Sequence, residues 1–148
     1  MIKTINCYFL CLFSAAANCQ MGCFQLAGEE FHIEPRVIYA IAVVESGLRA
    51  DAININKNSS IDIGLMQINT VHQNELASTG ITITELLEPC KNVIVGSWLL
   101  RRNINLMGGD VWKGVGLYHS ATPRFNTEYI AKVRRIYQQI GDEVAPAL

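Results

Sequence analysis

The sequence predicts a mainly α-helical domain that carries one small β-hairpin. Over most of the chain, apolar residues recur three and four positions apart, which is the spacing of one helix face. Two short runs, at 53–55 and 61–63, instead alternate isoleucine with a polar residue, as the strands of a hairpin do. Half of the 148 residues are hydrophobic, which is enough to build the core of one compact domain.

Local signals set the ends of the expected helices. Pro35 suits the first position of a helix, and Thr82 stands before Glu85 as in a capping box. Glycines 108–109 end a long apolar helix, and Asp110 caps the next one. These signals predict helices at 24–31, 35–46, 65–76, a short one from 82, and then 92–107, 110–118 and 127–140.

The last helix has one apolar and aromatic side, which we expect to be buried. That side consists of Tyr129, Val133, Ile136, Tyr137 and Ile140. The helical pattern ends at Gly141, so we expect residues 142–148 to form a mobile tail.

The first residues have the form of a secretory signal peptide. Lys3 precedes an apolar run from Cys7 to Ala17, which ends in small residues of the kind that signal peptidases cut after. The run is too short for a comfortable membrane span. We therefore expect residues 1–17 to be a cleaved signal and residues 18–141 to be the exported domain.

Charge and histidine spacing restrict the ligands. The net charge of -1 gives no broad basic surface for nucleic acid or for an anionic membrane. The short basic runs at 101–102 and 132–135 are typical of solvated helix faces. His32, His72 and His119 have no metal-ligand spacing with each other or with the cysteines, so we expect no metal and no cofactor.

The chain has five cysteines, and two of them, Cys7 and Cys11, would leave with the signal peptide. Cys19, Cys23 and Cys90 would remain in a compartment that permits disulfides. One of the three must stay unpaired or pair elsewhere. The count alone leaves open whether Cys19 or Cys23 pairs with Cys90.

Glu45 is the first candidate for a catalytic residue. It lies in the last turn of the expected helix 35–46, which Gly47 ends. Unpaired carbonyls and the negative end of the helix dipole disfavour a carboxylate there, and Ile41 and Val44 predict apolar surroundings. Both effects raise the pKa of a carboxyl group. A lone glutamate is usually a solvated residue, but a carboxyl still protonated near neutral pH can protonate a glycosidic oxygen.

Motifs around this glutamate point to a family. Glu45-Ser46 at the helix end and Gly-Leu-Met-Gln at 64–67 match, letter for letter, the first two motifs of the lytic transglycosylases, and the sequence resembles that lysozyme-like (SLT domain) superfamily. Leu-Tyr-His at 117–119 matches its third motif loosely, and Tyr129 matches the fourth. The resemblance covers 23–140 and is closest to the specialised IagB type that accompanies secretion, pilus or conjugation machines.

The resemblance implies a fold and a reaction. The fold is a lysozyme-like helical bundle with the hairpin beside a substrate cleft. The reaction is cleavage of the β-1,4 bond between N-acetylmuramic acid and N-acetylglucosamine in peptidoglycan, with Glu45 as acid and then as base, leaving 1,6-anhydromuramic ends. The expected setting is a periplasmic monomer whose partners are components of a secretion, type IV pilus or conjugation apparatus. A hydrolytic muramidase or a wall-binding assembly scaffold with little activity is the alternative.

The resemblance also assigns roles to single residues. It implies substrate contacts for Ser46, Gly64, Met66, Gln67, Tyr118 and His119, the last of which replaces the usual asparagine. Tyr129 is expected either near the Glu45 carboxyl or in the core. Asp62 on the hairpin either fixes the turn or tunes Glu45, and as a second acid it would favour hydrolysis. The cysteine positions of the family imply that Cys23 pairs with Cys90.

Overall fold

The computed structural model describes residues 22–144. Residues 22–31 are helical, and the chain continues with α2 (Pro35–Ser46), β1 (Ile53–Ile55), β2 (Ile61–Ile63), β3 (Ile68–Asn69), the 3-10 helix η1 (Thr70–His72), α3 (Gln73–Ser78), the 3-10 helix η2 (Ile83–Leu87), α4 (Pro89–Leu106), α5 (Val111–His119) and α6 (Pro123–Val144). This arrangement confirms the expected mainly α, α+β lysozyme-like class. The predicted signal peptide and Cys19 lie outside the described residues.

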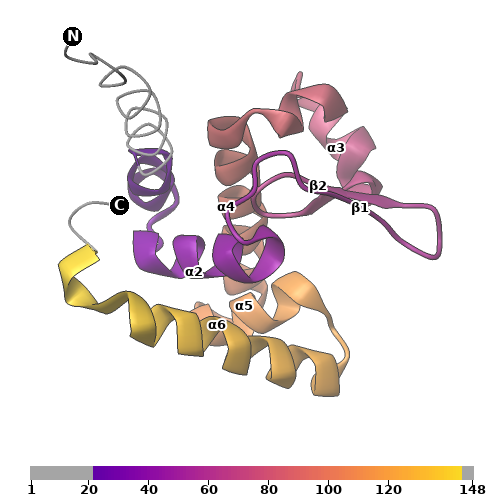
Figure 1. Cartoon of the computed structure of the whole chain (residues 1–148). Coiled ribbons are helices and arrows are strands. Elements are labelled where there is room, and N and C mark those ends of the chain that lie inside the picture. The colour runs from indigo at the N-terminus through magenta and orange to yellow at the C-terminus, as the bar shows by residue number, and fades with distance from the viewer. Residues whose placement is uncertain (1–21, 145–148) are drawn as a thin grey trace, which may run out of the picture.

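The helices surround α4, and the small sheet projects from one side of them (Figure 1). Helix α5 packs on α4, and α6 packs on both α5 and α2. The largest fully buried side chains are Phe24, Ile38, Ile41, Leu65, Met66, Ile68, Leu76, Leu86, Val93, Leu100 and Ile104. One core therefore joins the helices to the base of the sheet. Every helix among residues 22–144 is too short or too polar to span a bilayer.

The predicted helix caps are present. Gly47 ends α2 in the left-handed conformation (φ 61°), and its amide donates to the Val43 carbonyl at 3.0 Å. The Asp110 side chain accepts from the Lys113 amide at 3.0 Å at the start of α5. The Glu85 carboxylate accepts from the Thr82 amide at 2.8 Å at the start of η2. The cap of α2 matters most, because it fixes the turn that carries Glu45.

The prediction of one continuous helix over 65–76 is wrong. The chain turns at Gly64 (φ 76°) and Gln67 (φ 49°), forms β3, and only then enters η1 and α3. Strand β3 pairs with β2 in antiparallel register, so the expected hairpin is a three-stranded sheet of order β1-β2-β3. The reason is a distant residue: buried Asn92 accepts from the Met66 amide at 2.7 Å and donates to the carbonyl of Ile63 at 2.8 Å.

Two helices begin earlier than predicted. Helix α4 begins at Pro89 and α6 at Pro123, because a proline has no amide to lose at the first helical position. On α6, Tyr129 and Val133 are buried and the other three residues of the expected face are partly buried. The helix is interrupted at Gly141 (φ 63°), and 142–144 are helical beyond it. The rest of the expected mobile tail lies outside the described residues.

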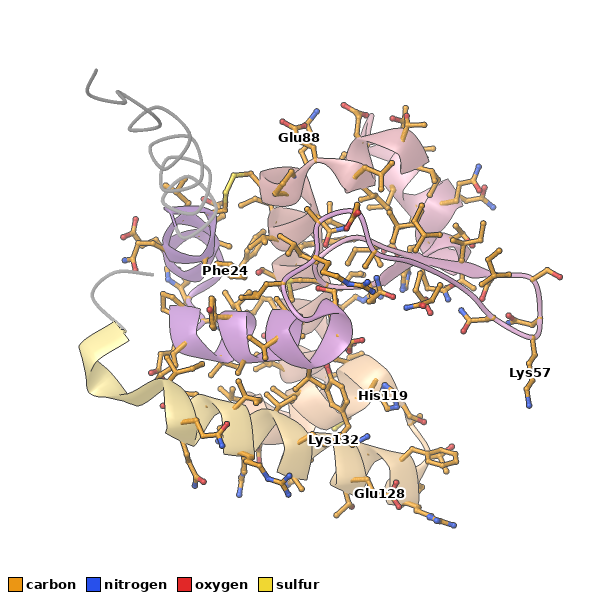
Figure 2. The ribbon with its side chains drawn as sticks, viewed as in Figure 1. Phe24, Lys57, Glu88, His119, Glu128 and Lys132 are labelled. Carbon is orange, nitrogen blue, oxygen red and sulfur yellow. A yellow bond between two sulfur atoms is a disulfide. The ribbon has the colours of Figure 1, made fainter. Side chains whose placement is uncertain are left out.

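A disulfide joins Cys23 to Cys90, with the two Cα atoms 5.2 Å apart. It ties the helical segment 22–31 to the first turn of α4, and Figure 2 draws it as a yellow bond. This bridge confirms the pairing that the family resemblance implied. It closes a loop of 67 residues, which on a chain-entropy estimate stabilises the fold by about 4 kcal/mol.

Candidate active site

A cleft of about 1180 Å³ lies between the sheet and the helices α4 and α5. The sheet side is polar, and it includes Asn56, Asp62, Gln67 and Asn69. The helix side is mixed, and it includes Leu99, Arg102, Asn103, Leu106, Leu117, Tyr118 and His119. Glu45 reaches this cleft from the last turn of α2. Both walls therefore offer polar side chains to a ligand.

Glu45 and Tyr129 form a direct pair. The Tyr129 hydroxyl donates to Oε1 of Glu45 at 2.5 Å, from the middle of α6 to the end of α2. Only 3% of Tyr129 is exposed. Both expectations for this tyrosine therefore hold, since its ring belongs to the core and its hydroxyl holds the carboxyl group.

Burial, with a smaller contribution from the negative charge of Asp62, raises the pKa of Glu45 to about 7. The hydrogen bond from Tyr129 acts in the opposite direction, because it stabilises the ionised carboxylate. The direction expected from the sequence is confirmed, and burial is its largest cause. At neutral pH this side chain can therefore both give and take a proton.

Asp62 is held in the cleft wall by two side-chain amides. Asn56 donates to Oδ2 at 2.8 Å, and Asn69 donates to Oδ1 at 2.6 Å. The cross-strand register sets Asn54, Asp62 and Asn69 side by side, so they share one face of the sheet. Both oxygens of Asp62 are thus engaged, and its carboxylate is fixed in direction. We call Asn56 and Asn69 the amide pair.

The amide pair was missed in the sequence. Asn69 also caps η1, because its Oδ1 accepts from the Val71 amide at 2.9 Å. The signal that could have found the amide pair is a period of two: Asn54 on β1 and Asn56 just after it face Asp62 on β2 and Ser60 just before it.

Gln67 and Tyr118 line the cleft, and both are anchored to backbone. Gln67 Nε2 donates to the Gly64 carbonyl at 2.8 Å, and its Oε1 accepts from Asn54. The Tyr118 hydroxyl donates to the Met66 carbonyl at 2.8 Å. Burial, with the nearby charges of the two cleft carboxylates, raises the pKa of Tyr118 well above its ordinary value.

His119 stacks on the tyrosine that holds Glu45. The rings of His119 and Tyr129 are 4.6 Å apart and nearly parallel, at 4°. Figure 2 shows His119 at the end of α5, close to α6 and its Lys132. Partial burial lowers the pKa of His119, and the charge of Lys132 lowers it further. A neutral imidazole at this place covers the Tyr129 ring from the cleft side.

Ser46 does not line the cleft, although the sequence suggested a substrate contact. It is 8% exposed, and its hydroxyl lies 2.8 Å from the Leu65 carbonyl and 3.1 Å from the Ala42 carbonyl. The hydroxyl therefore links the end of α2 to the turn at 64–67, and so it positions Glu45.

Met66 and Gly64 also lie beneath the cleft and not on its wall. Met66 is fully buried against Gly96, where an added Cβ would lie 2.6 Å from its sulfur. Gly64 has a left-handed φ, and a Cβ there would lie 2.2 Å from Asn92 Nδ2. Position 64 therefore needs a glycine, because the Asn92 side chain occupies the space that a Cβ would fill.

The site can act through acid and base groups. It combines a carboxyl that titrates near neutral pH, a tyrosine that fixes it, and a second carboxylate with a fixed direction. In the part of the chain that the structure describes, no three histidine, cysteine or acidic side chains are grouped so that they could hold a metal ion.

A family model and several known proteins match this chain. The family model for the transglycosylase SLT domain matches residues 22–136. Invasion protein IagB of Salmonella typhi is 41% identical over 125 residues, which are 81% of this chain and 78% of that protein. The X polypeptide of Escherichia coli is 36% identical over 139 residues, 88% of this chain and 82% of its own length. Protein IpgF of Shigella flexneri is 35% identical over 119 residues, 79% and 78% of the two chains.

The family match includes every residue that lines the cleft, from Glu45 at the end of α2 to His119 at the end of α5. The three relatives are similar over most of their own length, so the likeness is not confined to one motif. The chain belongs to the transglycosylase SLT domain family, as an IagB-like lytic transglycosylase.

Proposed function

We propose that this protein cleaves the β-1,4 bond between N-acetylmuramic acid and N-acetylglucosamine in peptidoglycan and leaves a 1,6-anhydromuramic end. The observation that carries the proposal is the cleft carboxyl of Glu45, whose pKa is about 7 and whose Oε1 accepts from Tyr129. Membership of the SLT domain family supports peptidoglycan as the substrate.

In the first half of the reaction, protonated Glu45 donates its proton to the bridging oxygen, and the bond from that oxygen to the anomeric carbon breaks. Positive charge then develops on the anomeric carbon. The carboxylate of Asp62, fixed by the amide pair, stabilises this charge from the sheet side, together with the N-acetyl group of the substrate.

In the second half, Glu45 is ionised, and the hydrogen bond from Tyr129 stabilises its carboxylate. It accepts the proton of the C6 hydroxyl while the C6 oxygen bonds to the anomeric carbon. The attacking group belongs to the same sugar, so the step has the advantage of an intramolecular reaction. No water enters, and Glu45 is protonated again at the end.

Hydrolysis is the second candidate, and the position of Asp62 is the observation that favours it. A hydrolytic glycosidase uses two carboxylates beside the scissile bond, and the cleft contains Glu45 and Asp62. Against this, both oxygens of Asp62 already accept hydrogen bonds from the amide pair. Such a carboxylate suits a fixed negative charge better than a nucleophile or a base.

The proposed setting is outside the cytoplasm, where the protein opens the wall locally for a secretion, type IV pilus or conjugation apparatus. The signal-peptide pattern of residues 1–17 supports export to the periplasm. One relative is named an invasion protein, which supports a specialised role in place of general wall turnover. Components of that apparatus would be its partners.

The test is mass spectrometry of the products that the mature protein releases from purified peptidoglycan, with Glu45→Gln as the comparison. Anhydromuropeptides that disappear in the variant are expected. Products that are one water heavier would replace the proposal by a muramidase, with Asp62 as a catalytic acid. Absence of any product that depends on Glu45 would favour the wall-binding scaffold.

A further inference from the structure

A second hollow adjoins the cleft on the outside of α4. It has a volume of about 450 Å³ and is lined by Trp98, Arg101, Arg102, Asn105 and Leu106. Arg102 and Leu106 also line the cleft, so the two spaces share one border. Residues three and four apart on a helix are neighbours, which places the two linings on adjacent stripes of α4. A ligand branch that leaves the cleft over this border enters the hollow.

The border residue Arg102 already binds a carboxylate. Its Nη1 donates to both oxygens of Glu75, at 2.8 and 2.9 Å, and its guanidinium lies 5.4 Å from the Trp98 ring. The Glu75 and Arg102 side chains are 42% and 38% exposed. An ion pair exposed to this degree is weak, so a carboxylate of a ligand can replace Glu75.

Arg101 adds a positive charge that no carboxylate of the described residues pairs with. Its Nε donates to the Phe31 carbonyl at 2.6 Å, and its Nη2 donates to the His32 carbonyl. These contacts hold the guanidinium in place and leave its charge unbalanced. The hollow therefore combines two guanidinium groups with apolar surface from Trp98 and from Leu106, which is 67% exposed.

We infer that this hollow binds a carboxylate of the peptide stems that peptidoglycan strands carry. The inference rests on the proposed function, because it assumes a glycan strand in the cleft. N-acetylglucosamine is neutral and needs hydroxyl partners, and the one carboxyl of N-acetylmuramic acid is tied up in its amide bond to the stem, whereas the peptide stem offers free carboxylates together with alkyl groups for Trp98 and Leu106. The protein thus selects strands that still bear peptides.

The experiment measures kcat/KM on peptide-bearing glycan strands and on the same strands after an amidase has removed the peptides, which leaves each muramic acid with its lactyl carboxylate alone. The readout is the ratio of the two values, which is expected to exceed one for the wild type. Arg102→Gln should lower this ratio by about tenfold, the loss of one charge-assisted hydrogen-bond pair. Glu75→Gln should raise it, because the variant removes the carboxylate that competes for Arg102.

Arg134→Gln is the matched control. Arg134 lies over the Trp112 ring at 4.6 Å, a similar pair that borders neither the cleft nor the hollow. Its ratio should equal that of the wild type. Arg102→Lys keeps the charge and loses the bidentate geometry, so it should give an intermediate ratio. If Arg102→Gln folds poorly, this second variant still tests the inference.

A ratio of one in the wild type overturns the inference, as does a Glu75→Gln ratio that falls together with that of Arg102→Gln. The second result would mean that the Arg102–Glu75 pair only stabilises the fold. Failure of the proposed function is a separate outcome, since it appears as absence of anhydro products from either kind of strand.

Discussion

Two neighbours of Glu45 shift its pKa in opposite directions, and single substitutions separate them. Tyr129→Phe removes the hydrogen bond that stabilises the carboxylate, so the pKa of Glu45 should rise. Asp62→Asn removes a negative charge, so the pKa should fall. The acid must be protonated to act, and activity declines as pH rises through this pKa.

The alkaline limb of the kcat/KM profile on purified peptidoglycan is therefore expected at higher pH in Tyr129→Phe and at lower pH in Asp62→Asn than in the wild type. The wild-type limb itself is expected near pH 7. Limbs that move in the same direction in both variants would show that the limb reports another group.

Burial of Glu45 also affects stability. Its pKa is about 7 in the folded protein and 4.5 as the ordinary value, so the folded state holds the proton more tightly. The stability that this proton contributes is complete below about pH 4.5 and is lost as pH rises to about 7. The total loss of unfolding free energy is about 3 kcal/mol. Glu45→Gln carries no such titration.

The variant is therefore expected to be more stable than the wild type at pH 8, with a difference that shrinks as pH falls through 7 toward 4.5. Urea unfolding at a series of pH values measures this difference. A gap between the two proteins that stays constant across the whole range would contradict the buried, titrating carboxyl.

Asn92 fixes the turn at residues 64–67, between strands β2 and β3. Its side chain bonds the Met66 amide and the carbonyls of Ile63 and Leu86, all within the core. Asn92→Ala leaves these groups buried without partners and should cost on the order of 3 kcal/mol. Asn74→Ala, at an exposed position on α3, is the matched control and should change the unfolding free energy little.

Denaturant titration measures the unfolding free energy of both variants. Equal losses in the two would mean that water replaces the Asn92 side chain as the hydrogen-bond partner. The catalytic rate of Asn92→Ala, measured at a temperature where it is folded, should also fall. The reason is that the Met66 carbonyl positions Tyr118 in the cleft.

Local signals in the sequence predicted the parts of the fold that are locally determined. The caps at Gly47 and Asp110 and the proline at the start of α2 were all predicted from neighbouring residues. The turn at 64–67 was mistaken for helix because Leu65 and Met66 have helical spacing, while the residue that bends the chain stands at position 92.

The candidate site also contains some residues that the sequence predicted and some arrangements that only the fold creates. Glu45, Asp62 and Tyr129 were found from motif positions, and the structure brings Tyr129 to Glu45. The amide pair depends on strand register, and the His119 ring stack depends on how α5 meets α6. Neither arrangement can be read from spacing along one segment. The burial of Ser46 and Met66 likewise follows from packing between distant elements.

At the scale of the whole molecule, the disulfide between Cys23 and Cys90 joins the first described helix to α4. A Cys23→Ser, Cys90→Ser double variant should lose about 4 kcal/mol of unfolding free energy. Cys19→Ser should match the wild type, which tests the other pairing that the cysteine count left open. Thermal or denaturant unfolding in the absence of reductant measures both, and a loss in Cys19→Ser of the same size would overturn the assigned bridge.

The candidate catalytic groups are divided between the helices and the sheet. Glu45 and Tyr129 lie on α2 and α6, which pack together, whereas Asp62 lies on the sheet across the cleft. Any displacement of the sheet toward the helices shortens the distance from Asp62 to Glu45 and leaves the Tyr129 hydrogen bond unchanged. Repulsion between like charges grows as they approach. Closure around a substrate would therefore raise the pKa of Glu45 and favour its protonated form, and reopening would lower that pKa again.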